Sequence, residues 1–441
     1  MKRRRRGLSG LIAVALLAGA CTTGATDGSS PASSPDAGGP LRVPSVAPGG
    51  APTLRAALAK LCVPITTPTG TPASGALPPE LASIAQQVEQ ARGHDFVTPP
   101  VAVAISNQEM DRRLKESFEA YYPEDLYDRR TFAWRTIGVI ASDADLHEAY
   151  KQFLTGGVVG FYDPETGELV YEGSGDLGFT ERLTLAHELT HALDDQIFDL
   201  KRLDALTNAC QDERFAGALG LVEGSAQYFA AASVAENPDV SLGDLLDAIA
   251  QAASSGSAPE GVPPFLYAIN VWPYAGGMSF VGTLAGEGGL PAIDRAFERL
   301  PASTEQVIHP ELYPSDEPVP VDIPDITRAL GPRWGDLDAM TIGEEWLRAM
   351  LVLRLDEGTA DAAAAGWDGG GYRAFTDGTD VAVIMRTAWD TQRDAVAFED
   401  ALGAWAATDA ISPTVTRDGS TVTAAFATSK AARDKAVGAL G

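Results

Sequence analysis

The stretch that decides the fold is residues 183–198, Leu-Thr-Leu-Ala-His-Glu-Leu-Thr-His-Ala-Leu-Asp-Asp-Gln-Ile-Phe. Its apolar residues recur at the three- and four-residue spacing of a helix. Just before it, Thr180 is a residue type that caps helices, and Glu181 suits a first turn. The sequence therefore predicts a helix capped by Thr180, with His187 and His191 one turn apart on one face.

This pair of histidines flanks Glu188, and the chain has only five histidines in its 441 residues. Neutral imidazole suits zinc, and a catalytic zinc site keeps three protein ligands and a water. Zinc lowers the pKa of that water to about 7, and a neighbouring carboxylate can take its proton. His187 and His191 are therefore predicted Zn²⁺ ligands, with Glu188 as the catalytic base.

The third ligand has to come from elsewhere in the chain. Ile197 stands where some zinc hydrolases carry a third histidine. Glu223 is an acid inside the apolar helical run 216–232, where carboxylates are seldom buried unless they are paired or bound to metal. Glu223 is the preferred third ligand. Glu213 and Asp212, at the start of that run, stay open as alternatives.

Further residues are candidates for supporting roles. A hydrolase needs a donor for the developing oxyanion, and the candidates are His309 and Tyr274. Asp195 and Gln227 follow ligands by four residues and can accept an imidazole N–H, although a solvated helix face explains them nearly as well. Two remaining histidines, His94 and His147, lie in polar helical contexts and are predicted to be surface residues.

The N-terminus predicts export. Residues 1–20 combine a basic cluster with a short apolar run that ends in small residues, which is the layout of a signal peptide. Cys21 follows directly and predicts a lipid anchor in the membrane on the extracytoplasmic face, with simple secretion as the alternative. Residues 21–52 are rich in Ser, Pro and Gly and predict a flexible tether. The net charge of −27 argues against a nucleic-acid partner.

Two cysteines remain after Cys21. Outside the cytoplasm Cys62 and Cys210 can form a disulfide, and two buried free thiols are the alternative.

The pattern along the chain predicts an α+β fold that is mainly helical. We expect one catalytic domain over 53–312, an irregular connection over 313–340, and a C-terminal α+β subdomain over 341–441. Strands are predicted at 99–105, 381–385 and 420–426, and a hairpin at 158–171. Helices are predicted at 107–122, 128–140, 144–154, 210–235, 241–254, 262–300, 342–356 and 391–407, and at the C-terminus.

Several motifs together resemble a family of exported bacterial and archaeal proteins. They are Gly160-Phe161-Tyr162-Asp163, the run from His187 to Gln196, Val222-Glu223-Gly224, the run Ser303 to Pro310, and Gly366-Trp367 with Ala388-Trp389-Asp390. Members of this family are predicted zinc metallopeptidases of the gluzincin type, often lipoproteins. The resemblance implies a zincin-like core, His187, His191 and Glu223 as ligands, and Glu188 as acid and base. One departure is Asp368-Gly369-Gly370-Gly371, where the family pattern has Gly-Gly-Asp.

The sequence thus supports two hypotheses from different classes. The first is a membrane-tethered zinc metallopeptidase that acts on a peptide or protein; a zinc hydrolase of another amide, such as peptidoglycan, is not separated from it. The second is a non-catalytic envelope lipoprotein that uses the fold as a scaffold or binding module. An intact Glu188 favours the enzyme, because a scaffold has no need of a base.

Overall fold

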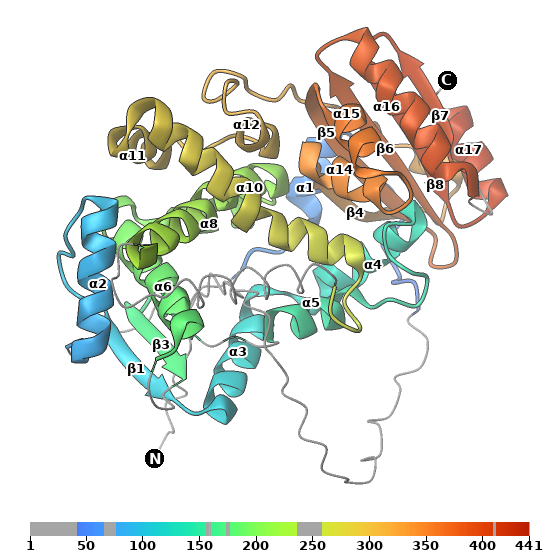
Figure 1. Cartoon of the computed structure of the whole chain (residues 1–441). Coiled ribbons are helices and arrows are strands. Elements are labelled where there is room, and N and C mark those ends of the chain that lie inside the picture. Colours follow the sequence, from blue (N-terminus) through green and yellow to red (C-terminus); the bar gives the residue numbers. More distant parts are fainter. Residues whose placement is uncertain are drawn as a thin grey trace, which may run out of the picture.

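The computed structural model of the chain describes residues 42–65, 76–155, 158, 160–172, 177–235, 258–408 and 412–440. The described elements form a helical part with a small sheet and a C-terminal part built on a larger sheet (Figure 1). The fold class is therefore α+β, as the sequence predicts.

The helical part contains most of the helices. Helix α1 (Leu54–Leu61) precedes this part in the chain and packs on the large sheet of the C-terminal part. The elements of the helical part are α2 (Pro79–Arg92), β1 (Val101–Ile105), α3 (Asn107–Tyr121), α4 (Glu124–Ile137), α5 (Leu146–Thr155), β2 (Gly160–Asp163), β3 (Glu168–Glu172), α6 (Phe179–Phe198), η1 (Leu200–Leu203), α7 (Asp204–Asn208), α8 (Asp212–Ala235), α10 (Pro264–Gly288), α11 (Leu290–Glu298) and α12 (Thr304–Ile308).

The motif helix α6 lies at the centre of this part. Every residue from Thr184 to Asp194 is buried, because α2, α8 and β2 pack around it. A helix that is buried on all sides belongs to the core rather than to the surface. The helix begins at Phe179, its cap residue is Gly178, and no side chain caps it. The prediction that Thr180 caps this helix is therefore wrong.

Helices α8 and α10 approach each other so closely that glycine is needed at the crossing. A Cβ added to Gly224 would lie 2.1 Å from the carbonyl carbon of Gly277. Any larger residue would push the helices apart, since backbone atoms cannot move aside as a flexible side chain can. Because Gly224 follows Glu223 directly, this contact also fixes where Glu223 lies.

The small sheet has the strand order β1-β3-β2. Strand β3 pairs in parallel with β1 and antiparallel with β2. The hairpin predicted at 158–171 is present as β2 and β3, joined by a turn in which Gly167 adopts a φ of 70°. Strand β2 is one of the two edge strands of this sheet, and it packs against α6.

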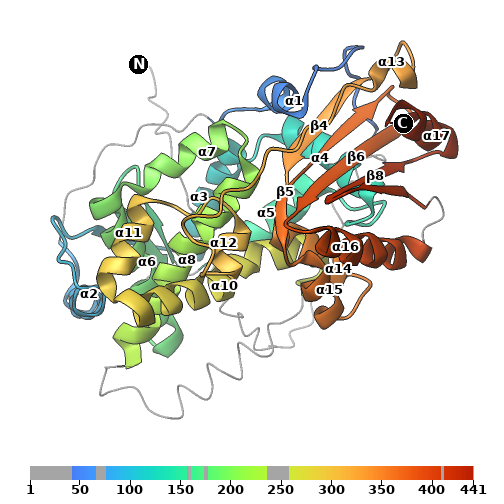
Figure 2. The same cartoon turned by 90° about the horizontal axis from the view of Figure 1, so that it is seen from above.

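The C-terminal part is an antiparallel sheet with helices on both faces. Its order is β4-β5-β6-β8-β7. The elements are α13 (Thr327–Leu330), β4 (Gly335–Thr341), α14 (Glu344–Val352), α15 (Glu357–Ala364), β5 (Trp367–Thr376), β6 (Val381–Trp389), α16 (Gln392–Trp405), η2 (Ala406–Thr408), β7 (Thr414–Asp418), β8 (Thr421–Ala427) and α17 (Lys430–Leu440). Helices α1, α13 and α17 lie along one face, and α14, α15 and α16 along the other (Figure 2).

Strand β6 shows why helices pack on both faces of this sheet. Val381, Val383 and Met385 belong to one core, and Ala382 and Ile384 belong to the other. Side chains alternate between the faces of a strand, so an unbroken apolar run predicts burial on both sides.

The first strand of this sheet lies inside the segment predicted to be irregular. Residues 335–340 belong to β4, and α13 lies at Thr327–Leu330. The prediction of an irregular connection over 313–340 is therefore wrong for these residues. The helix predicted at 241–254 falls outside the described residues.

The N-terminal segment also departs from the prediction. Gly49 forms a parallel bridge with Gly335, and the Ala51 N–H donates a 2.7 Å hydrogen bond to Asp336. Ala51 itself is buried. A flexible tether over the whole of 21–52 is thus wrong for Gly49 to Pro52, which dock on the large sheet.

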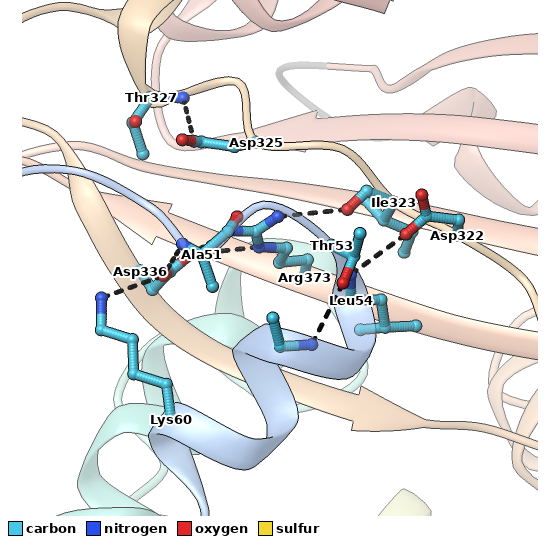
Figure 3. Close-up of polar contacts among 11 residues, drawn as sticks. Ala51, Thr53, Leu54, Lys60, Asp322, Ile323, Asp325, Thr327, Asp336 and Arg373 are labelled. Carbon is cyan, nitrogen blue, oxygen red and sulfur yellow. Dashed lines mark hydrogen bonds and ion pairs between the residues drawn. The ribbon is translucent and has the colours of Figure 1, made fainter.

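A buried ion pair holds this segment in place (Figure 3). The Arg373 guanidinium donates to Asp336 at 3.0 Å and to the backbone carbonyl of Ala51. Lys60 of α1 contacts the same carboxylate at 3.1 Å. The pair is shielded from water, so it needs these extra hydrogen bonds to offset its desolvation.

Candidate metal centre

Helix α6 brings the two histidines of the motif together in the core. His187 and His191 are both buried, and their Nε2 atoms lie 3.0 Å apart. Their rings meet nearly at right angles, at 84°. One helical turn therefore brings the two Nε2 atoms side by side, close enough to bind one ion, as the four-residue spacing predicts.

Helix α8 supplies the carboxylate that completes the cluster. Glu223 is buried, and its Oε2 lies 3.4 Å from Nε2 of both histidines. Among the described residues, His187, His191 and Glu223 are the group of metal-binding side chains whose ligand atoms converge, all within 4.8 Å of one another.

These spacings can be compared with those around zinc. Ligand atoms about 2.0–2.1 Å from a tetrahedral Zn²⁺ lie roughly 3.3–3.4 Å from each other. The distances in the cluster, 3.0 Å and twice 3.4 Å, are close to that value. Two imidazoles and a carboxylate are also the donor set of a catalytic zinc site. The residues present therefore fit a zinc ion.

Burial and charge adjust the acidity of the three groups. Burial lowers the pKa of His187 to about 4, although Glu223 opposes the shift. Burial also acts to lower the pKa of His191, but the Glu223 carboxylate outweighs it and the pKa is raised. Burial acts to raise the pKa of Glu223, yet the two imidazoles lower it overall. Before a metal binds, the pocket therefore favours a neutral His187 and an ionised Glu223, both of which metal binding requires, whereas His191 has to release a proton when the metal binds.

Glu188 lies beside the cluster with one oxygen free. Its Oε2 accepts a 2.8 Å hydrogen bond from the backbone N–H of Tyr162 in β2. Its Oε1 is buried and has no hydrogen-bond partner. Burial raises the pKa of Glu188 to about 8. An unpaired buried carboxylate oxygen is costly, so it indicates a functional group more than a structural one.

Sequence reasoning missed the part that Tyr162 plays. The Tyr162 N–H holds Glu188, and its hydroxyl donates to Asp195 at 2.9 Å. The other oxygen of Asp195 accepts from the Leu200 N–H. Asp195 therefore orients Tyr162 rather than an imidazole. The motif Gly160 to Asp163 was the available signal, but a backbone N–H leaves no mark in a sequence.

A second support lies behind α6. Asp194 accepts hydrogen bonds from the buried Arg92 of α2 at 2.8 Å and from Ser225 of α8 at 2.7 Å. This network ties the helix with the histidines to the helix with Glu223. Gln227, one turn after Glu223, interacts with the His187 ring and partly offsets the lowering of its pKa.

The two oxyanion candidates lie in different places. The Tyr274 ring stacks on His187 with centroids 6.0 Å apart, and burial, with the charges of Glu223 and Glu188, raises its pKa well above the ordinary value. Its hydroxyl therefore keeps its proton. His309 is instead bonded to Glu344 at 3.0 Å, which raises the pKa of His309.

The alternative third ligands are occupied elsewhere. Glu213 accepts from the backbone N–H and the hydroxyl of Thr304, and Asp212 pairs with Arg130 at 3.0 Å. Neither belongs to the converging group.

The remaining histidines also have partners. The ring of His94 contacts Asp294, and His147 is buried with its Nε2 3.1 Å from the carbonyl oxygen of Tyr122. The surface prediction is therefore wrong for His147, because its helix packs against Phe118.

A cavity of about 290 Å³ borders the cluster, with Glu223 and Tyr274 in its wall. Its lining comes from α4, α5, α7, α8, α10 and α14, from β4 and from residues just after α1, so it lies where the helical and C-terminal parts meet. A concave, largely apolar site beside convergent polar groups is the usual form of a small-ligand pocket. His309 is outside this lining.

The run Ser303 to Pro310 forms a buried junction between the two parts. The Ser303 hydroxyl caps α12 by accepting from the Gln306 N–H, and Gln306 donates to the backbone of Asp316. The Thr304 hydroxyl accepts from the Glu345 N–H of α14. Glu305 is buried with one oxygen unpaired, and burial followed by the charge of Glu344 raises its pKa to about 9.

This junction leads to a prediction about pH. The ordinary pKa of the Glu305 carboxyl is 4.5, so between that pH and about 9 the folded chain binds more protons than the unfolded chain. Stability therefore falls as the pH rises through this interval. In Glu305→Gln, the fall in Tm from pH 6 to pH 9 should be smaller by roughly 3–6 °C. Thermal unfolding at several pH values measures this. The exposed Glu298→Gln is the control, and an equal fall in the wild type and Glu305→Gln would contradict the prediction.

The two remaining cysteines are bonded. Cys62 follows α1 and Cys210 precedes α8, and their sulfur atoms form a disulfide across a sequence separation of 148 residues. Cys210 also borders the cavity. The bond closes a long loop of the unfolded chain, so it should stabilise the fold.

Loss of this disulfide is expected to reduce stability substantially. The double variant Cys62→Ala with Cys210→Ala should lose about 2–5 kcal/mol of unfolding free energy in urea titrations, since the unfolded chain regains loop entropy. Reductant should lower the wild type to the same level and leave the double variant unchanged. Wild-type stability that does not respond to reductant, under conditions where thiol titration finds both cysteines reduced, would oppose this account.

Comparison with known proteins adds one finding. Residues 330–437 match a domain of unknown function (DUF8575). The match covers the sheet of the C-terminal part and leaves out the metal centre. No curated protein and no solved structure matches the chain.

None of the described helices is both long and apolar enough to cross a membrane. Cys21 and the predicted signal peptide lie outside the described residues.

Proposed function

We propose that the chain is a zinc-dependent metallopeptidase with a zincin-like core. The observation that carries this proposal is the convergence of His187, His191 and Glu223 in the core, with the free oxygen of Glu188 beside them. The edge strand β2 adds support, because it positions Glu188 through a backbone N–H.

The metal chemistry follows from the donor set. A zinc ion held by His187, His191 and Glu223 would lower the pKa of a bound water to about 7 and polarise the substrate carbonyl. The positive charge would also draw the pKa of Glu188 down from its raised value. Glu188 is then a carboxylate that can accept a proton near neutral pH.

The side chains of this chain carry the proton transfers. Glu188 takes a proton from the attacking water and gives it to the leaving amine. The Tyr162 N–H keeps the carboxylate in one orientation during both transfers. Tyr274 keeps its proton at neutral pH and donates a hydrogen bond to the oxyanion.

We also propose where the protein is located. The predicted signal peptide and Cys21 support an exported protein that is anchored by lipid at the extracytoplasmic face of the membrane, and the disulfide suits an oxidising compartment. The substrate would then be a peptide or protein outside the cytoplasm.

A non-catalytic scaffold is the alternative. It would keep the fold without needing Glu188 in its buried position, where one oxygen lacks a partner and the other takes up a backbone N–H. A scaffold has no need of a buried carboxyl group with an unpaired oxygen, which costs free energy. The cost of this carboxylate favours the enzyme.

The test is hydrolysis by the zinc-loaded chain. A proteome-derived peptide library should yield new termini, and a chelator followed by added zinc should remove and restore them. Cleavage of peptidoglycan fragments but not of the library would assign a different amide. No cleavage of either by zinc-loaded, folded protein would leave the scaffold as the better account.

A further inference from the structure

We infer that the cavity beside the metal centre takes the side chain of a cationic residue, arginine or lysine, of the substrate. This inference rests on the proposed function, because only a peptidase would bind the peptide as a substrate. The geometry behind it is separate, because it concerns lining residues other than those of the metal-binding cluster.

The cavity adjoins the metal centre. Glu223 and Tyr274 belong both to the metal centre and to the cavity wall. A chain held with its scissile bond at the metal centre would therefore have a neighbouring side chain at the cavity. A volume of about 290 Å³ accommodates the longest side chains.

The walls suit a long side chain with an apolar stem. Tyr122, Tyr127 and Tyr150 line the cavity and pack on one another, with ring centroids 5.0–5.4 Å apart. Ile269 and Met340 extend the apolar surface. Methylene groups gain from such burial, and aromatic rings also attract a cation.

Buried acidic side chains with unpartnered oxygens line the cavity. Glu345 is 3 % exposed, and its Oε2 is buried without a hydrogen-bond partner. Asp212 offers a second unpartnered buried oxygen, Oδ2. Both residues line the cavity. Trp346 adds one unpartnered N–H to the lining, which can donate a hydrogen bond to one acceptor atom of the bound peptide.

The counter-charges nearby do not balance these acids. Two cations, Arg130 and Lys201, also line the cavity, against five acids. Arg130 pairs with Asp212 at 3.0 Å, but it also lies 3.5 Å from the buried Asp338. Arg348 reaches the other oxygen of Glu345 only at 3.6 Å and bonds Asp361 at 2.6 Å. Each guanidinium is shared between two carboxyl groups, so the acids of the lining have no full counter-charge of their own. Burial raises the pKa of Glu345 to about 8, and a cation bound beside it would draw that pKa down and favour the carboxylate.

Other side chains fit this cavity less well. An aromatic or aliphatic side chain would fill the tyrosine-lined region but leave the carboxylate oxygens unpaired, which costs free energy in a dry site. An acidic side chain would add repulsion. A guanidinium or ammonium group pairs with the free oxygens while its stem lies along the rings.

Binding of matched peptides tests the inference without any need for hydrolysis. The probes are Ac-Ala-Ala-Xaa-Ala-Ala-NH₂ peptides with Xaa as arginine, norleucine, phenylalanine or glutamate. Titration calorimetry uses zinc-loaded full-length protein carrying Glu188→Gln, so that no peptide is consumed. The arginine peptide should bind about tenfold or more tightly than the norleucine peptide, since charge-assisted hydrogen bonds are strong.

Two variants locate the preference. Glu345→Gln should reduce the arginine-to-norleucine ratio to about threefold or less. Asp212→Asn is a second variant that keeps the test valid if the first does not fold. Glu344→Gln is the matched control, because Glu344 is the adjacent buried acid, bonds to His309, and lies outside the lining.

The outcomes are distinguishable from those of the hydrolysis test. Equal binding of the norleucine or phenylalanine peptide, no measurable binding of the arginine peptide, or an unchanged ratio in both lining variants would overturn the inference. A chain that prefers the arginine peptide but cleaves no amide would support the inference and sink the proposed function. Cleavage with no preference for a cationic residue would do the reverse.

Discussion

Replacing Glu188 by glutamine is expected to lower peptide hydrolysis by about 10²–10⁴-fold. Glutamine has nearly the same shape, and its amide oxygen can still accept the hydrogen bond from the Tyr162 N–H. It cannot take a proton from water, so the step that the carboxylate performs is lost. The measurement is kcat/KM on one peptide from the library, with wild type and variant at equal zinc content.

The control for this prediction lies on the same helix. Glu181 is an exposed acid in the first turn of α6, and Glu181→Gln should stay within about twofold of wild type. Zinc should remain bound to Glu188→Gln at one ion per chain. A variant that keeps more than a tenth of the wild-type rate would show that another group is the base.

Replacing Glu223 by glutamine is expected to weaken zinc binding more than 100-fold. Loss of a residue that only orients a ligand typically costs 10–100-fold in metal affinity, so loss of a ligand should cost more. The neutral amide also leaves the paired imidazoles without their carboxylate, which lies 3.4 Å from both. Competition with a chromogenic chelator measures the affinity.

A buried acid on the same helix provides the comparison. Glu213 bonds to Thr304 and stands ten residues before Glu223. Glu213→Gln should leave zinc affinity unchanged even where it alters the melting temperature. If Glu213→Gln weakened zinc binding and Glu223→Gln did not, the third ligand would have been assigned wrongly.

The centre of the fold could be predicted because its signals are local. The spacing of His187 and His191 within a helix brings their Nε2 atoms together whatever the rest of the chain does. Glu223 could be singled out because a carboxylate inside an apolar run needs a buried partner. The hairpin of β2 and β3 was visible from β-branched and aromatic residues on both sides of a Pro/Gly turn.

Other features depend on contacts between distant residues. Strand β5 contains Gly369-Gly370-Gly371, a run that indicates a loop by composition, yet a Cβ at Gly370 would lie 2.7 Å from the Ile342 backbone oxygen. The glycines are there because neighbouring elements come close. Propensity alone cannot reveal such crowding.

The docking of the N-terminal segment on the large sheet could not be predicted from the sequence for the same reason. Residues 49–52 are composed like a tether, and what orders them is the Arg373–Asp336 pair far along the chain. The hydrogen bond from Tyr162 to Glu188 could not be predicted from the sequence either, because its donor is a backbone N–H. The cavity and its excess of carboxylates needed α4, α8 and α14 to be placed together.

The most direct test of the central claim is a crystal structure of the zinc-loaded chain with anomalous scattering measured at the zinc edge. The account predicts one peak, about 2.0–2.2 Å from Nε2 of His187, Nε2 of His191 and a carboxylate oxygen of Glu223. A folded, zinc-soaked chain with no peak between these three side chains, or with zinc bound only elsewhere, would contradict it.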